Sequence, residues 1–313
     1  MTNYIDRQTT LSEQVVLTGI GVHSGAPATL TLLPAEAGVG IVFQRTDHEN
    51  ATAVPALWSR VSATSLCTVL SDPAKDGVST VEHVMAALAG LGIDNVVAEI
   101  DGPEMPIMDG SSAPFVDAIL QAGIKRLDRG RRYLRIKKTV RVDAGSAWCE
   151  LVPHDTGRFD ITIDFDTPLI GRQRFAADMT PDVFRKDLSR ARTFGNVSDV
   201  EQLWKMGFAR GSSLENSVAI SDGKVLNPEG TRWPDEFARH KALDAVGDLA
   251  LAGLPILGLY RSFKGGHKMN HAIVEKLFED WTAFEIVEAP AFRGAGQSVT
   301  PGLAAAAFGP DVA

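Results

Sequence analysis

Three side chains that can bind a metal or transfer a proton follow one another at four-residue steps: His240, Asp244 and Asp248. The surrounding stretch is typical of a helix, in which a step of four residues turns by roughly 40°, so the three share one face. Leu243 and Val246 lie on the opposite face and can be buried. His-x-x-x-Asp is a usable spacing for metal ligands. Taken alone, the stretch fits a solvated helix face with a hydrogen bond from His240 to Asp244 equally well.

A second candidate pair, Glu82 and His83, stands at the start of an apolar stretch with the pattern of a helix. Ser79, three residues before Glu82, completes a capping-box pattern, in which Glu82 would only stabilise the start of the helix. The alternative is a metal site in which His83 is a ligand and Glu82 takes a proton from bound water. This segment alone favours the capping box.

Together, the two stretches contain the parts of a catalytic metal site. A catalytic zinc ion needs three protein ligands and an open position for water, whose pKa it lowers to about 7. His83, His240 and Asp244 can supply the ligands, Glu82 can accept the proton, and Asp248 can orient a neighbouring group from one turn further along. Two histidines and one carboxylate suit ferrous iron as well as zinc.

His267 is a candidate proton donor for such a site. It follows a predicted strand and two glycines, Gly265 and Gly266, which let the backbone come close to a ligand. An imidazolium at this position can protonate a departing amine. A histidine in a loop is not by itself evidence of catalysis, so the role of His267 as a proton donor depends on the presence of the metal site.

The composition limits the kinds of protein that can carry these residues. The 313 residues are 44% apolar, which is enough for two hydrophobic cores, and the net charge of −8 argues against a nucleic-acid-binding surface. We find no signal-peptide pattern, no run of roughly 20 apolar residues, and only two cysteines, Cys67 and Cys149. We expect a reduced, cytoplasmic protein without an integral membrane segment.

The elements that must position the candidate residues occur twice. Residues 12–45 and 133–166 both predict short antiparallel strands. The segments ALAGLGI at 87–93 and ALAGLPI at 250–256 match at six of seven positions, and each ends a predicted helix just before a strand. The order of helix, glycine and strand therefore predicts two units of one topology.

This duplication sets the predicted domain organisation. We expect an α+β protein with a first domain at residues 1–127 and a second at 128–300, which meet in the basic stretch 125–132. The Ala- and Gly-rich residues 301–313 predict a flexible tail.

Several long motifs, spread in one order from about residue 8 to 278, resemble those of the UDP-3-O-acyl-N-acetylglucosamine deacetylase family. They are TVEH at 80–83, AALAGLGIDN at 86–95, PIMDGS at 106–111, SRARTFG at 189–195, RHKALDAVGD at 239–248 and GH at 266–267. The resemblance implies two similar domains, each a β-sheet with helices packed on one face, and an active site between the two helix layers. It also implies zinc-dependent hydrolysis of the acetamide of UDP-3-O-(3-hydroxyacyl)-N-acetylglucosamine, which releases acetate and the free 2-amino sugar nucleotide early in lipid A synthesis.

The resemblance also assigns a role to each chemical residue. The carbonyl oxyanion would be stabilised by a threonine that supplements the metal. In this sequence the metal ligands are His83, His240 and Asp244, the general base is Glu82, the general acid is His267, its tuning partner is Asp248, and the oxyanion helper is Thr193.

Substrate contacts follow from the same resemblance. Lys241 and Lys264 match positions that meet the sugar and diphosphate, Phe165 matches an aromatic that stacks on uracil, Phe194 borders the acyl-chain passage, and Gly266 lies in the glycine–histidine motif. An insert near residues 195–224, which carries the large apolar side chains of Leu203, Trp204, Met206 and Phe208, would form that passage.

One position departs from the family. A lysine often precedes the tryptophan of the second domain's early strand, whereas this chain has Ala147 before Trp148. Contacts to the diphosphate would then be weaker, or would move to Arg141 or Lys241.

Two other functions stay open on the sequence alone. A zinc hydrolase of another substrate, such as a peptide or a different acylated sugar, would use the same ligands. The second alternative is a metal-independent nucleotide-sugar binding protein. Such a protein would need neither the Glu82-His83 pair nor the His240 and Asp244 pair, so their coexistence argues against it. We further expect a monomer.

Overall fold

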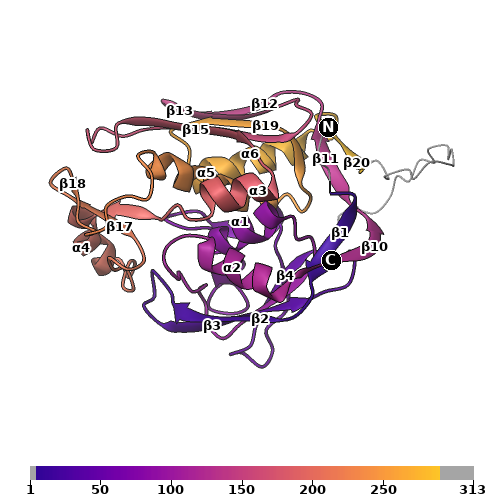
Figure 1. Cartoon of the computed structure of the whole chain (residues 1–313), viewed down its shortest axis with the longest axis horizontal. Coiled ribbons are helices and arrows are strands. Elements are labelled where there is room, and N and C mark those ends of the chain that lie inside the picture. The colour runs from indigo at the N-terminus through magenta and orange to yellow at the C-terminus, as the bar shows by residue number, and fades with distance from the viewer. Residues whose placement is uncertain (1–4, 290–313) are drawn as a thin grey trace.

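The chain folds into four layers, in the order sheet, helices, helices, sheet. The structure is a computed structural model and describes residues 5–289. Figure 1 shows one sheet at the bottom of the view and the other at the top, with the helices between them. The predicted α+β class is confirmed. The tail predicted at 301–313 and the last residues of the second predicted domain lie outside the described residues.

The lower sheet belongs to the first part of the chain. Its strands, in spatial order, are β2 (Val15–Ile20), β3 (Pro27–Pro34), β9 (Val96–Ile100), β4 (Ile41–Arg45) and β5 (Val54–Pro55). In β3 the side chains of Ala28, Leu30 and Leu32 alternate with more exposed ones and are buried, as expected for a sheet with one covered face. The helices α1 (Glu82–Leu91) and α2 (Ala113–Ala122) cover that face (Figure 1).

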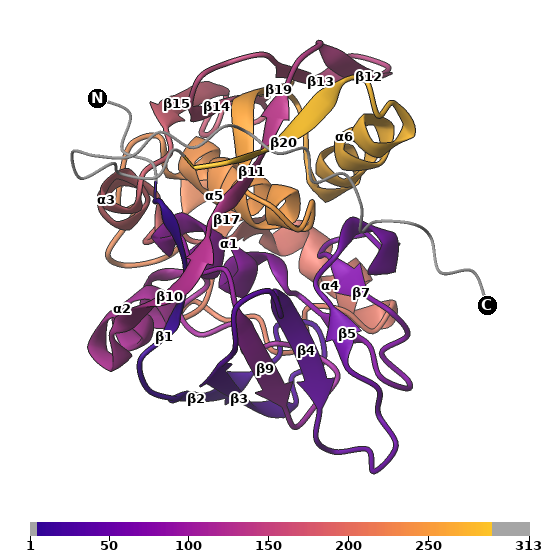
Figure 2. The same ribbon diagram turned by 90° about the vertical axis from the view of Figure 1, so that its right-hand side faces the viewer.

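The upper sheet belongs to the second part. Its strands are β12 (Val140–Ala144), β13 (Ala147–Val152), β19 (Ile256–Phe263), β14 (Gly157–Asp164) and β15 (Arg172–Asp178), and β11 (Arg132–Ile136) and β20 (Phe284–Glu288) extend it from the start of β19. The helices α5 (Glu236–Ala250) and α6 (His267–Glu279) lie on its inner face (Figures 1 and 2).

The two sheets repeat one topology. The central strand β9 is antiparallel to β3 and parallel to β4, and β19 is likewise antiparallel to β13 and parallel to β14. The outer hairpin partners β2 and β5 correspond to β12 and β15. The internal duplication predicted from the 87–93 and 250–256 match is thus present in the fold.

The basic stretch 125–132 connects the two repeats through regular structure. Residues 125–130 belong to β10 (Ile124–Gly130), which pairs with β1 (Arg7–Leu11). The proposed division between residues 127 and 128 therefore falls within a strand. It stays a proposal.

Each repeat also carries an insertion before its central helix. In the first repeat it holds the short 3-10 helix η1 (Trp58–Arg60) and the strands β6 (Val61–Ala63), β7 (Val69–Leu70) and β8 (Val78–Ser79). In the second it holds α3 (Pro181–Val183), the π-helix η2 (Phe184–Leu188), β16 (Phe194–Asn196), α4 (Val197–Lys205), β17 (Val218–Ser221) and β18 (Lys224–Val225). Of the large apolar residues of this insert, Leu203 and Trp204 lie in α4, and Met206 and Phe208 follow its end. In Figure 1 the part of this insertion that contains α4, β17 and β18 projects from the left of the layers, whereas α3 lies between the two sheets.

The helices α1 and α5 cross at the centre of the molecule. Nine of the ten residues of α1 are buried, so it has no solvated face. A Cβ atom added to Gly247 of α5 would lie 2.0 Å from the carbonyl oxygen of Glu82 and 3.0 Å from the backbone nitrogen of Ala86. Gly247 is therefore the residue that lets the two helix backbones touch beside Glu82. In residues 5–289 we find no helix long and apolar enough to cross a membrane.

Candidate metal centre and active site

Three potential metal ligands meet where α1 crosses α5. His83 is the second residue of α1, and His240 and Asp244 lie one turn apart on α5. The Oδ1 atom of Asp244 is 3.7 Å from His83 Nε2 and 3.3 Å from His240 Nε2, and one ligand atom from each residue lies within 4.8 Å of the others. All three side chains are buried, so the alternative of a solvated face is wrong. We call these residues the metal-ligand group.

The donor atoms of the metal-ligand group fit a divalent metal. The ring of His240 faces the backbone oxygen of Ala191 through Nδ1, at 3.0 Å, which leaves Nε2 directed at the group. Asp244 Oδ1 is buried without a hydrogen-bond partner in the described part of the chain. A buried carboxylate oxygen without a donor is costly, and a bound cation would remove that cost.

The protonation states also suit a metal. Burial and the neighbouring His240 lower the pKa of His83 to about 3, and burial lowers the pKa of His240, so both rings are neutral. Burial alone would raise the pKa of Asp244, but His240 and Lys241 hold it well below its usual range. Neutral imidazoles and an ionised carboxylate are the forms that bind metals.

Glu82 lies beside the metal-ligand group and does not cap its helix. Its Oε2 accepts a hydrogen bond from the backbone N–H of Thr68 at 3.0 Å, whereas Ser79 lies in β8 and donates its hydroxyl to Pro103. The capping-box interpretation is therefore wrong, because tertiary contacts bind both side chains. Burial raises the pKa of Glu82 to about 7, even though His267 opposes the rise.

His267 faces Glu82 from the opposite repeat. It opens α6, and its Nε2 lies 3.8 Å from Glu82 Oε1 and 3.9 Å from Asp244 Oδ2. Its Nδ1 donates to Asp248 Oδ2 at 2.8 Å. Burial alone would lower the pKa of His267, but the carboxylates of Asp248 and Glu82 raise it to about 9. The ring is therefore protonated near neutral pH.

Sequence reasoning missed the residues that hold Asp248. Thr68 donates its hydroxyl to Asp248 Oδ1 at 2.6 Å, and Asn270 donates its amide to Oδ2 at 2.8 Å. The hydroxyl of Tyr260 in turn donates to Asn270 Oδ1 at 2.6 Å. Asn270 comes three residues after His267, which places both on one helix face, so that spacing was a usable signal.

Lys241 pairs with a metal ligand. Its Nζ donates to Asp244 Oδ2 at 2.9 Å and lies 5.8 Å from the centre of the Phe194 ring. An ammonium group has three donors, so Lys241 can hold the carboxylate and still reach a substrate oxygen.

Aromatic rings run from the surface to the metal-ligand group. Phe165 is 41% exposed and meets Phe194 edge to face at 5.8 Å, and Phe194 meets Phe237 at 4.8 Å and His240 at 6.2 Å. The structure thus brings Phe165 and Phe194 together in one wall of the site. The outer ring remains free to stack on a planar group.

The other predicted substrate residues border this wall. Lys264 lies 3.3 Å from Asp164 Oδ2, and a Cβ atom added to Gly266 would meet nothing within 4 Å, so the space beside this backbone is open. Thr193 follows Ala191 by two residues, and its backbone N–H donates to the carbonyl of Gly110 at 2.8 Å. Within residues 5–289, the Thr193 hydroxyl makes no hydrogen bond to the metal-ligand group.

Position 147 begins β13, one residue before Trp148. Trp148 pairs with Phe263, the last residue of β19, and Lys264 follows directly after that strand. Arg141 already has partners within the protein, because its guanidinium binds Asp143 and Glu150 and stacks at 4.5 Å on the ring of Trp148. Of the two replacements suggested for the missing lysine, Arg141 is the less available.

The second insertion contacts the loop between β2 and β3. The backbone N–H of Arg210 donates to His23 O at 3.1 Å, and the rings of His23 and Phe208 meet at 5.4 Å. Trp204 and Met206 are 52% and 63% exposed. This stretch thus presents large apolar side chains to solvent.

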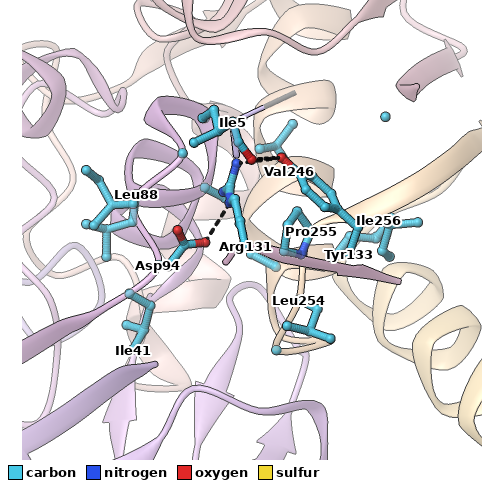
Figure 3. A pocket seen from close by; sticks show the side chains of 18 of the residues that line it. Ile5, Ile41, Leu88, Asp94, Arg131, Tyr133, Val246, Leu254, Pro255 and Ile256 are labelled. Atoms are coloured by element: carbon cyan, nitrogen blue, oxygen red, sulfur yellow. Dashed lines mark hydrogen bonds and ion pairs between the residues drawn. The ribbon is translucent and has the colours of Figure 1, made fainter. Parts of the chain in front are cut away.

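A separate cavity of about 390 Å³ lies on the other side of the α1–α5 crossing. Figure 3 shows apolar side chains of both repeats, among them Leu88 and Ile256, on either side of an ion pair between Arg131 and Asp94 at 2.8 Å. No histidine or cysteine occurs among the described residues that line it. The described residues that line this cavity therefore offer no histidine ligand for a metal.

The fold and the site define a class: duplicated α+β proteins that can hold a divalent metal between two helix layers through two histidines and one carboxylate. Residues 8–279 match the family model of UDP-3-O-acyl N-acetylglycosamine deacetylase, and the chain belongs to that family. It is 54% identical over 284 residues to the UDP-3-O-acyl-N-acetylglucosamine deacetylases of Brucella ovis and Brucella canis, which covers 90% of this chain and 99% of each relative. The protein of the same name from Brucella melitensis biotype 2 is 53% identical over the same length.

Proposed function

We propose that this chain hydrolyses the acetamide of UDP-3-O-(3-hydroxyacyl)-N-acetylglucosamine, in lipid A synthesis, and that the reaction depends on a bound metal. Membership of the deacetylase family supports the substrate. One observation carries the chemistry: the buried metal-ligand group has Glu82 and His267 beside it, 3.8 Å apart and from different repeats. A carbonyl group placed there would meet a base and an acid at once.

In this mechanism the protein residues move the protons. A divalent metal on the metal-ligand group would supply Lewis acidity toward the amide carbonyl and toward water. Glu82, whose pKa of about 7 suits a base near neutral pH, removes a proton from the attacking water. The hydroxyl of Thr193 donates to the oxyanion. His267 is protonated below a pKa of about 9, and it gives its proton to the nitrogen of the departing sugar amine while Asp248 holds its ring.

The substrate would lie along the aromatic wall. Phe165 would stack on the uracil, Lys264 and Lys241 would bind the diphosphate and sugar, and the open space beside Gly266 would let the ligand approach the backbone. Phe194, which packs against Phe237, would border the acyl-chain passage.

The insert near residues 195–224 would receive the acyl chain. Its exposed Trp204 and Met206 offer apolar surface that an acyl chain could cover. The identity of the metal, zinc or ferrous iron, belongs to the proposal as well, because the ligand set suits both. So do a cytoplasmic location and a monomeric state.

A single experiment tests the reaction class and the metal together. Acetate release from UDP-3-O-(3-hydroxymyristoyl)-N-acetylglucosamine is measured with the purified protein, with and without a chelator, and after zinc or ferrous iron is added back. We expect activity to disappear with the chelator and to return with metal. A fully metallated protein that releases no acetate would contradict the substrate, and activity that resists complete removal of metal would contradict the mechanism.

A further inference from the structure

A buried chain of hydrogen bonds leads from the candidate general acid away from the site. It runs from His267 to Asp248, from Asp248 to Asn270, and from Asn270 to the hydroxyl of Tyr260, with distances of 2.8, 2.8 and 2.6 Å. Asp248, Asn270 and Tyr260 are 3%, 3% and 1% exposed. Solvent therefore does not compete for these bonds, and each partner must come from the protein.

We propose that Asn270 is a positioning residue for the Asp248–His267 pair and that Tyr260 fixes the orientation of its amide. The inference rests on the proposed role of His267. Neither Asn270 nor Tyr260 touches the metal-ligand group through a recorded contact, so both act through Asp248.

The geometry explains why Asp248 needs a second donor on Oδ2. His267 is the first residue of α6, and its ring is bound to the protein mainly through Nδ1. A carboxylate that held the ring with no further donors could rotate with it. Thr68 on Oδ1 and Asn270 on Oδ2 fix the carboxylate plane, and Thr68 comes from the opposite repeat.

Tyr260 decides which end of the Asn270 amide faces Asp248. A phenol hydroxyl that donates to Oδ1 leaves the NH₂ group of Asn270 to point at the carboxylate. Burial raises the pKa of Tyr260 well above its usual value, so the hydroxyl stays protonated and can donate. The reversed amide would place two oxygens face to face and is disfavoured.

The test compares the variants Asn270→Asp and Tyr260→Phe with a matched control, Asn95→Asp. Asn95 is 1% exposed, its amide donates to Gln8 and Thr9, and it lies in the first repeat away from the site. Replacement of Asn270 by aspartate keeps the shape and turns the donor into an acceptor. We expect kcat to fall about 10- to 100-fold for Asn270→Asp and less for Tyr260→Phe, while KM and the metal content change by less than about threefold.

A second measurement needs neither metal nor activity. In the metal-free protein, the proton on His267 Nδ1 should give a downfield NMR signal, assigned by its loss in His267→Gln. We expect that signal to shift or disappear in Asn270→Asp and to remain in Asn95→Asp. A normal kcat and an unchanged signal in Asn270→Asp would overturn the proposal, as would equal effects in the control. If the wild-type protein releases no acetate but the signal still responds to Asn270→Asp, the positioning role holds and the proposed reaction fails.

Discussion

The two central helices are equivalent in topology but carry different halves of the site. In α1 the chemical side chains are adjacent, Glu82 and His83, at the helix start. In α5 they are spaced along the helix, with His240 and Asp244 in the metal-ligand group and Asp248 bound to His267. The ends that follow, 87–93 and 250–256, have stayed alike and line the remote cavity.

This difference shows what each half of the duplication contributes. Where the repeats still match, apolar side chains pack two similar layers together and their identity matters little to chemistry. Where they differ, α1 supplies one ligand and the base, and α5 supplies two ligands and the support for the acid. Neither repeat can form the site alone. Substitutions of His240 in α5 and of Glu82 in α1 should therefore impair different steps, metal binding in the first case and proton transfer in the second.

The largest effect is expected for a ligand on α5. His240→Ala removes a donor that the structure cannot replace, because Asp244 and His83 would be left with an incomplete set. Activity should fall by more than the roughly 10²–10⁴-fold that loss of an acid or base costs. Metal analysis of the purified variant should find the metal absent or substoichiometric, and a fully metallated His240→Ala protein would contradict the assignment.

The base on α1 should behave differently. Glu82→Gln keeps the shape of the side chain but cannot accept a proton, so turnover should fall by about 10²–10⁴-fold. Because Glu82 is outside the metal-ligand group, the metal should stay bound at one equivalent. Acetate release and metal content measured on one preparation separate the two results. Near-normal turnover would show that another group is the base.

The pH profile of activity should have an acidic limb set by Glu82 of the first repeat and an alkaline limb set by His267 of the second. The reaction needs Glu82 ionised and His267 protonated, and their pKa values are about 7 and about 9. A bound cation favours the ionised carboxylate and the neutral ring, so it lowers both pKa values. In the metal-bound protein, activity should therefore fall tenfold per pH unit below the lowered pKa of Glu82 and above the lowered pKa of His267. The acidic limb should vanish in Glu82→Gln and the alkaline limb in His267→Gln, and the reverse assignment would exclude this mechanism.

The crossing of the helices offers a test by stability. Gly247→Ala would drive a Cβ atom into the carbonyl oxygen of Glu82, whereas the atoms nearest to a Cβ atom at Gly90 of α1 belong to the ring of Phe184. Overpacking of this kind costs about 1–3 kcal/mol, and both variants should be destabilised by about that much. Only Gly247→Ala should also lower kcat, because it moves the backbone of the base. Denaturant unfolding and turnover of the two variants measure this difference. Equal turnover would show that the position of α1 is not critical.

Much of the site could be predicted from the sequence because its residues occur within short helical spacings or long motifs. His240, Asp244 and Asp248 share a face through the helix period alone, and the 87–93 and 250–256 match predicted the duplication. The role of Glu82 could not be read locally, since Ser79 imitates a capping box and only tertiary contacts decide. Thr68 and Asn270 were missed because their partner, Asp248, lies on a different element, and Tyr260 was missed because its partner is Asn270 of α6.

The smallest effect concerns position 147, where the family's motif and this chain differ. A lysine there would precede Trp148, whose partner Phe263 directly precedes Lys264 of the predicted diphosphate subsite. A hydrogen bond to a charged group contributes about 1.5–3 kcal/mol at most. Because the position is partly solvated, Ala147→Lys should lower KM by about 3- to 10-fold and leave kcat unchanged. Ala144→Lys adds the same charge on the opposite strand of the hairpin and serves as the control. If both variants lower KM equally, and added salt reverses the decrease in KM, the lysine acts through long-range electrostatic attraction of the diphosphate. Position 147 would then not be part of a specific diphosphate subsite. A gain confined to Ala147→Lys would mean that the second repeat binds the diphosphate less tightly here than its fold allows.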